Sequence, residues 1–243
     1  MKNLALLLLI VIVSCKNAKK ESITAQSIVD TSIKLSGGKL YETKKIAFNF
    51  RDLKYLLEIN DGKKEMRRTS INDSLIIEDV VYQGFKRYIN KTNVVVPDSM
   101  AIKYTNSINS VFYFALLPYG LNDAAVQKEY LGEVSIKEKE YYKVKVTFYE
   151  ENGGEDFEDV YVYWFNKDTF LPDYLAYKFY TDGGGMRFRA AYNERYVSGV
   201  RFVDYENYTP KNNGVSVMQL DSLYHTNQLQ LLSKIELHNI NLY

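Results

Sequence analysis

Residues 141–208 constrain the fold most, because they carry more than half of the chain's aromatic residues and alternate with a period of two. One parity holds Tyr142, Val144, Val146 and Phe148, and the positions between them are mostly polar. An antiparallel strand that is buried on one face requires this alternation. The turn-forming segments ENGGED, GGG and VSG separate the runs, so the stretch predicts a meander of long antiparallel strands.

Two main helices are predicted outside the meander. Apolar spacing of three and four residues predicts one over about residues 23–36, which Gly37-Gly38 ends. The same spacing predicts a second helix that Asp98 caps and Pro118 closes. A short helix near residues 221–228 is a further expectation.

Strands are predicted before the meander and at the end of the chain. Residues 46–59 alternate, and Asn60-Asp61-Gly62 predicts a hairpin after them. The closing strand, residues 234–243, changes its apolar parity between Leu237 and Ile240, as at a β-bulge. The fold class is therefore α+β and mostly antiparallel, with about eleven strands. No Pro-, Gly- or Ser-rich linker interrupts residues 23–243, which predicts a single domain.

The N-terminus has the features of a targeting segment. Lys2 precedes an apolar run over residues 4–13, which is too short to span a bilayer but suits a signal-peptide core. The run ends at Ile12-Val13-Ser14-Cys15, which resembles the lipobox of bacterial lipoproteins. This resemblance implies a signal peptide over residues 1–14, a lipid on Cys15 and a lipidated tether over 15–22.

Two consequences follow for the mature protein. Cys15 is the only cysteine of the chain, so we expect no intramolecular disulfide. Lys16 is not the acidic residue that retains some lipoproteins inside, and family resemblance therefore implies lipid anchoring in the cell outer membrane, facing the periplasm. The membrane is thus an expected partner through Cys15.

The order of elements supports a further resemblance. In order, the chain has a lipobox, an early helix, a curved antiparallel sheet, a mid-chain helix and then the segment YYKVKVTF…DVYVYWFNKDTFLPDYLAYKFYTDGGG. This order of elements resembles that of the LolA/LolB lipoprotein-carrier superfamily. The resemblance covers most of residues 23–243 as an architecture and about 140–208 as a motif. It implies a curved half-barrel sheet whose concave face, covered by helices, holds acyl chains. The arginine that the carriers use against their substrate matches no position here.

We expect the ligand to contact aromatic and aliphatic side chains on the concave face and on the mid-chain helix. The predicted ligand-binding residues are Phe48, Phe50, Ile108, Phe112, Tyr142, Val144, Val146, Phe148 and Trp164. A lipid or acyl chain is the expected ligand, because these side chains would form a dry wall.

Catalytic and metal-binding patterns are missing from the sequence. It contains no G-x-S-x-G elbow, phosphate loop or H-E-x-x-H motif, and its two histidines, His225 and His238, lie in a polar tail. The acidic loop around residues 150–159 matches no calcium loop, so we expect a solvated hairpin. Gly183-Gly184-Gly185 is expected at a hairpin tip. We therefore predict no enzyme activity, no metal and no cofactor; a hydrolase or a lysine Schiff-base aldolase is disfavoured.

Charge limits the partners. The 31 Lys and Arg residues nearly balance the 30 Asp and Glu residues, which argues against nucleic acid. Arg187 and Arg189 share one strand face, and we expect them to oppose acidic residues on a neighbouring strand; an anionic head group is the alternative.

Two functions remain open from the sequence. The first is a lipid-anchored envelope lipoprotein that binds an apolar ligand without catalysis. The second is a structural or adaptor lipoprotein with a solid core and an envelope protein as partner. An alternating strand fits both, because a sheet that lines a cavity and one that packs against helices have the same pattern.

Overall fold

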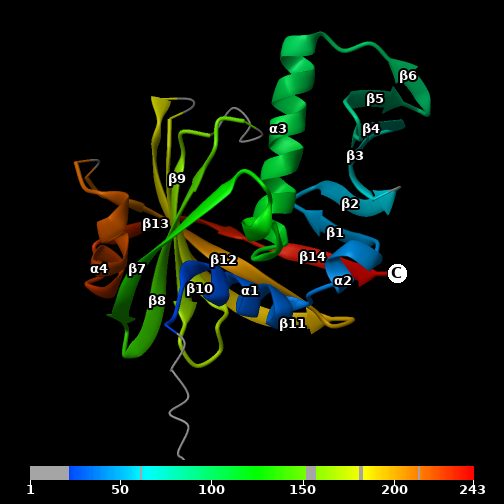
Figure 1. The fold of residues 1–243 in the computed structure, drawn as a ribbon. Coiled ribbons are helices and arrows are strands. Elements are labelled where there is room, and N and C mark those ends of the chain that lie inside the picture. The colour runs from blue at the N-terminus through cyan, green and yellow to red at the C-terminus, as the bar shows by residue number, and fades with distance from the viewer. Residues whose placement is uncertain (1–21, 61, 152–156, 181–182, 213) are drawn as a thin grey trace, which may run out of the picture.

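A computed structural model describes residues 22–60, 62–151, 157–180, 183–212 and 214–243. In these residues the strands form two antiparallel sheets of seven strands each. Figure 1 shows the two sheets side by side, with the long helix α3 standing between them.

The sheet that contains the first strands is here called the N-terminal sheet. In spatial order it consists of β14 (Leu237–Leu242), β1 (Ile46–Phe50), β2 (Leu53–Asn60), β3 (Lys63–Asn72), β4 (Leu75–Val81), β5 (Phe85–Ile89) and β6 (Thr92–Val94). The predicted hairpin after β2 is confirmed, since Asn60 pairs with Lys63.

The second sheet, here called the C-terminal sheet, contains the aromatic meander. In spatial order it consists of β13 (Leu229–Ile235), β12 (Val200–Pro210), β11 (Gly185–Val197), β10 (Pro172–Phe179), β9 (Val160–Asn166), β8 (Lys139–Phe148) and β7 (Val126–Ile136). The neighbours from β7 to β13 follow chain order, as a meander requires.

Helices pack on both sheets (Figure 1). They are α1 (Ala25–Ser36), α2 (Leu40–Thr43), α3 (Asp98–Ala115), the 3-10 turns η1 (Tyr119–Asn122) and η3 (Val217–Gln219), and α4 (Leu220–His225). Gly37 ends α1 as predicted, with a φ of 143° that favours glycine. The predicted cap of α3 is wrong by one residue: Pro97 precedes the helix, and Asp98 is its first residue, because proline suits a position that donates no N–H.

The two faces of the C-terminal sheet are buried differently. Val144 and Val146 face the N-terminal sheet and join the larger core, which also includes Ile108 and Phe112 of α3. Tyr141 faces the opposite side and joins a smaller core under α4. The alternation along residues 141–148 is therefore confirmed, but both of its faces are covered.

The predicted number of strands is too low, and the predicted single curved sheet is two sheets. The closing strand is in fact two strands, because Ile235 ends β13 in one sheet and Leu237 begins β14 in the other. The predicted bulge is present: the register of β14 against β1 shifts between residues 238 and 241. Alternation alone could not show the division, because residues 229–242 change sheet without a turn signal.

A polar contact joins the two sheets where the chain passes from β13 to β14. The buried carboxylate of Asp204 on β12 accepts a hydrogen bond from the Leu237 amide, with an N–O distance of 2.9 Å. Arg195 on β11 donates to the Leu237 carbonyl at 2.7 Å and to Asp204 at 3.0 Å. We call Asp204, Arg195 and Leu237 the sheet junction.

Candidate functional site

A cavity of about 650 Å³ lies between the two sheets at the C-terminal half of α3. Its apolar lining includes Leu57, Met66, Phe112, Tyr113, Phe114, Leu116, Leu117, Tyr119, Phe148, Tyr161, Leu175, Tyr177 and Phe179. Asn109 and Ser110 also line it and are exposed to solvent, so the cavity opens to the outside. Its size is that of a typical small-molecule site.

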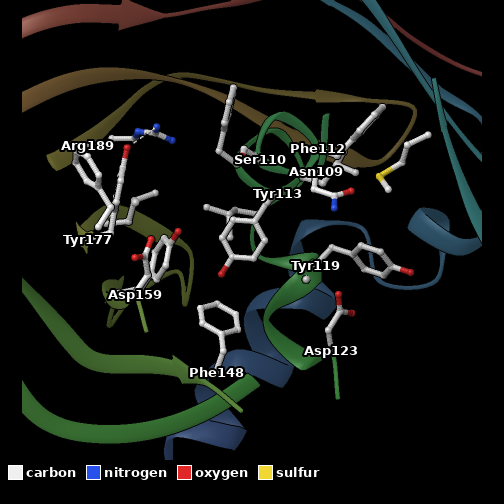
Figure 2. A pocket seen from close by; sticks show the side chains of 18 of the residues that line it. Asn109, Ser110, Phe112, Tyr113, Tyr119, Asp123, Phe148, Asp159, Tyr177 and Arg189 are labelled. Atoms are coloured by element: carbon white, nitrogen blue, oxygen red, sulfur yellow. Dashed lines mark hydrogen bonds between the residues drawn. The ribbon is translucent and has the colours of Figure 1, made fainter. Parts of the chain in front are cut away.

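Tyr113 occupies the centre of this cavity. Figure 2 shows its ring between Phe148, Tyr119 and Asp123 on one side and Arg189 with Tyr177 and Asp159 on the other. The Tyr113 ring centroid lies 5.9 Å from that of Tyr161 and 6.5 Å from that of Phe148, both edge-on. Aromatic side chains from a helix and from two strands therefore meet in one wall.

Strand register explains why the aromatic wall is continuous. Tyr177 on β10 pairs with Tyr161 on β9 and with Arg187 on β11, so these three side chains share one face. The rings of Tyr161 and Tyr177 are stacked with centroids 5.3 Å apart. Arg189 lies two residues after Arg187 on β11 and points to the same face, because side chains alternate along a strand.

The hydroxyls of Tyr113 and Tyr161 in the wall, and that of the buried Tyr163 next to Tyr113, stay protonated at ordinary pH. The Tyr113 and Tyr163 hydroxyls are hydrogen-bonded at 2.8 Å. Burial, the largest cause, raises the pKa of Tyr113, Tyr161 and Tyr163 above that of a free tyrosine. These three tyrosines therefore offer neutral hydroxyls and no phenolate base.

Charged side chains lie at two places in the lining. At one, Lys64 lies 3.3 Å from the carboxylate of Asp123 and 5.0 Å from the centroid of the Tyr119 ring. At the other, the guanidinium of Arg189 lies 5.1 Å from the centroids of Phe114 and Tyr177 and donates to the Tyr177 hydroxyl at 3.0 Å. Arg187 lies on the same strand, and its guanidinium carbon is 5.1 Å from the centroid of the Phe179 ring.

Two of the predicted ligand-binding residues, Phe112 and Phe148, line the cavity. The others on that side belong to the surrounding packed core: Phe48, Ile108, Val144 and Val146 are buried in it, and Phe50 and Tyr142 pack against it.

Trp164 is not on this face, contrary to expectation. β9 pairs with β8 so that Tyr163 is opposite Val144 and Trp164 is opposite Lys143. Trp164 therefore points to the other side of the sheet, where its indole N–H donates to Asp221 of α4 at 3.0 Å. Lys143 donates to the same carboxylate oxygen at 2.6 Å.

The main residues that the sequence analysis missed are Tyr113, Tyr161, Leu175 and Tyr177. Alternation along β10 could have grouped Leu175 with Tyr177 on one face, whereas both parities of β9 are apolar and do not single out Tyr161. Arg187 and Arg189 were expected to oppose acidic residues. Their cross-strand neighbours are instead Tyr177, Leu175 and Asn207.

Other sequence candidates give no site. Among the residues that the structure describes, no group of three or more His, Cys, Asp or Glu side chains could hold a metal ion. His225 accepts a hydrogen bond from the Lys137 amide at 3.1 Å, and His238 is exposed. Gly183-Gly184-Gly185 lies at the hairpin between β10 and β11, as expected.

The predicted lipid-attachment residue, Cys15, and the signal peptide lie outside the described residues, as does Asp156 of the acidic loop. Within the described residues, no helix has the length and apolar character needed to cross a membrane.

Comparison with solved structures gives low sequence identity over nearly the whole chain. A LolA superfamily protein from Nitrosomonas europaea is 12% identical, with 91% of this chain and 94% of that chain covered and a TM-score of 0.49. A DUF1329 family protein from Desulfovibrio piger is 10% identical, with 89% and 92% covered and a TM-score of 0.47. A LolA superfamily protein is thus among the structures to which this chain is similar.

Comparison with curated proteins gave no match. The sequence pattern of one family, described as a family of unknown function (DUF6503), matches residues 1–237. Since this match covers almost the whole chain, the protein belongs to the DUF6503 family.

Proposed function

We propose that this protein is a cell-envelope lipoprotein, anchored in the outer membrane through Cys15, that binds an apolar lipid or acyl ligand without catalysis. The observation that carries the proposal is the cavity of about 650 Å³ between the sheets, which aromatic and aliphatic side chains line. This space favours a binding protein over an adaptor with a solid core.

The energetics of the cavity are adequate for reversible binding. A ligand that buries about 400 Å² of apolar surface gains about 10 kcal/mol, and association costs at least about 4 kcal/mol. The difference is at most about 6 kcal/mol, which corresponds to a dissociation constant of tens of micromolar or weaker.

The polar groups of the wall fit binding better than catalysis. Burial raises the pKa of Tyr113 and Tyr161, so their hydroxyls remain neutral hydrogen-bond donors. Asp123 is paired with Lys64. A general base near the centre of the cavity would require a side chain that exchanges protons near neutral pH.

A neutral fluorescent probe tests the proposal without involving charge. The chain from residue 16 onward, which contains every described element, is titrated with N-phenyl-1-naphthylamine. We expect saturable binding in the micromolar range. Ser110→Trp places a large ring in the cavity from an exposed position on α3 and should weaken binding at least about tenfold.

Ser99→Trp is the matched control, because Ser99 is exposed on the first turn of the same helix and does not line the cavity. It should leave binding unchanged. The proposal fails if the probe does not saturate, or if both tryptophan variants bind it equally well.

A further inference from the structure

We propose that the ligand of this cavity carries an anionic head group, which Arg187 and Arg189 bind while its apolar chain lies along the aromatic wall. This inference rests on the proposed function and specifies its ligand class, an anionic amphiphile.

The two arginines are placed at the cavity by strand register. Arg187 pairs with Tyr177, and both line the cavity. Arg189 reaches far enough between the sheets to contact Phe114 of α3, with its guanidinium 5.1 Å from the ring centroid. The cationic groups therefore lie next to the apolar wall and not on the outer surface.

Neither arginine has a carboxylate partner within the described part of the chain. Five other arginines each form an ion pair there: Arg67, Arg68, Arg87, Arg195 and Arg201. Arg187 donates only to a carbonyl, that of Met186, at 2.8 Å. Arg189 donates to Tyr177, and its Nε is buried with no hydrogen-bond partner. Both guanidiniums thus retain donors for an incoming group.

The acids of the lining do not cancel this charge. Asp123 is paired with Lys64 at 3.3 Å. Asp159 is buried and adds one further negative charge to the lining, against the two positive charges of Arg187 and Arg189. The lining thus holds three basic side chains, Lys64, Arg187 and Arg189, and two acidic ones, so a positive charge remains.

The chemistry of guanidinium selects the head group. Arginine stays protonated in proteins and offers planar pairs of N–H donors that match the oxygens of a carboxylate or a phosphate. Residues two apart on a strand are roughly 7 Å apart, so one anionic group can contact both side chains. Electrostatic attraction to an anionic ligand is stronger for a partly desolvated guanidinium without a carboxylate partner than for a guanidinium that is exposed to water.

The test compares four compounds at one salt concentration: palmitate, palmitoyl lysophosphatidate, 1-hexadecanol and inorganic phosphate. Each is measured by displacement of N-phenyl-1-naphthylamine or by calorimetry. We expect palmitate or lysophosphatidate to bind at least about tenfold more tightly than hexadecanol. Phosphate alone should bind weakly, because it lacks the chain.

The variant Arg187→Gln/Arg189→Gln should abolish the preference for the anionic compounds, so that palmitate and lysophosphatidate bind no more tightly to it than hexadecanol does. Lys178→Gln is the matched control. Lys178 is exposed on β10 beside Tyr177 and points away from the cavity, so removing its charge should change nothing. If the double variant does not fold, Arg187→Gln alone and the loss of the preference at high salt decide the question.

Equal affinity for palmitate, lysophosphatidate and hexadecanol would overturn this inference and leave the proposed function intact. Tight, arginine-dependent binding of phosphate alone would also overturn it, since the site would then take a free anion. Failure of all chain-bearing compounds to bind would overturn both proposals.

Discussion

The hydroxyl of Tyr113 on α3 and that of Tyr163 on β9 lie 2.8 Å apart. Tyr163 is fully buried, whereas Tyr113 lines the cavity. The hydrogen bond between them therefore connects the helix to the C-terminal sheet at the edge of the cavity. Its two partners have unequal access to solvent, and this asymmetry can be measured.

Tyr113→Phe should lower the free energy of unfolding by about 1–3 kcal/mol, because it leaves the buried Tyr163 hydroxyl without a partner. Tyr163→Phe should cost less, since Tyr113 as a whole is only partly buried and lines the cavity, from which water can reach a hydroxyl that has lost its partner. The double variant should be close to the wild type. Urea denaturation of the three variants measures this, and equal losses in both single variants would contradict the asymmetry.

Asp221 should be more important for stability than for binding. Asp221→Ala leaves the buried ammonium of Lys143 without its carboxylate, 2.6 Å away, and should cost about 3–5 kcal/mol. Lys143→Met/Asp221→Leu removes both charges and should recover most of that stability. Probe binding should be unchanged in the double variant, because Asp221 packs on the face opposite the cavity. A large loss of binding would show that the two faces are coupled.

Alkaline pH should unfold the protein cooperatively. Burial raises the pKa of Tyr113, Tyr161 and Tyr163, so above about pH 10 the unfolded chain loses phenol protons that the folded chain keeps. The free energy of unfolding then falls as pH rises, by about 1.4 kcal/mol per pH unit for each tyrosine. Below pH 10 these groups should have no effect.

Tyrosinate absorbance and circular dichroism, recorded together against pH, measure this transition. The buried tyrosines should ionise only as the circular dichroism signal is lost. Complete ionisation of all 22 tyrosines near pH 10 with an unchanged fold would contradict the expectation.

Val146→Glu should lower the free energy of unfolding by several kcal/mol, because Val146 is fully buried in the packed core and the new carboxylate would have no partner there. Phe148→Leu, at a partly buried residue of the same strand that lines the cavity, should lower probe affinity with a smaller loss of stability. Thermal melting and probe titration of both variants distinguish core from wall. A folded Val146→Glu variant with weakened binding would place Val146 in the wall.

Cys15→Ser should release the protein from the membrane fraction and abolish acyl labelling, because stable anchoring takes at least two acyl chains. Ser14→Ala keeps a small residue before the cysteine and should remain membrane-bound. Fractionation with labelled palmitate measures both variants. Membrane retention of Cys15→Ser would contradict the lipobox interpretation.

Local pattern predicted most of the elements of this fold. The spacing of Ile108 and Phe112 placed α3, and the parity of Val144 and Val146 identified the face toward the larger core. These features are decided within one helix or strand, where side-chain period alone determines which residues share a face.

The pairing between elements could not be predicted in the same way. Trp164 is aromatic, as many residues of the wall are. Because it pairs with Lys143 of β8, however, its side chain lies on the other side of the sheet. A shift of one residue reverses every side chain of a strand, and no signal in β9 fixes that register by itself. The division into two sheets was missed for a related reason, since β14 pairs with β1, far away in the sequence.

The sheet junction also determines the order in which this chain can complete its structure. β1 lies between β2, its immediate successor, and β14, which holds the last residues of the chain. During synthesis or export from one end, β1 must therefore wait with one side unpaired until Leu237 arrives and Asp204 accepts its amide. Contacts of such long separation slow folding and leave a strand edge open to wrong partners. A nascent chain of this protein should thus need protection until β14 is released.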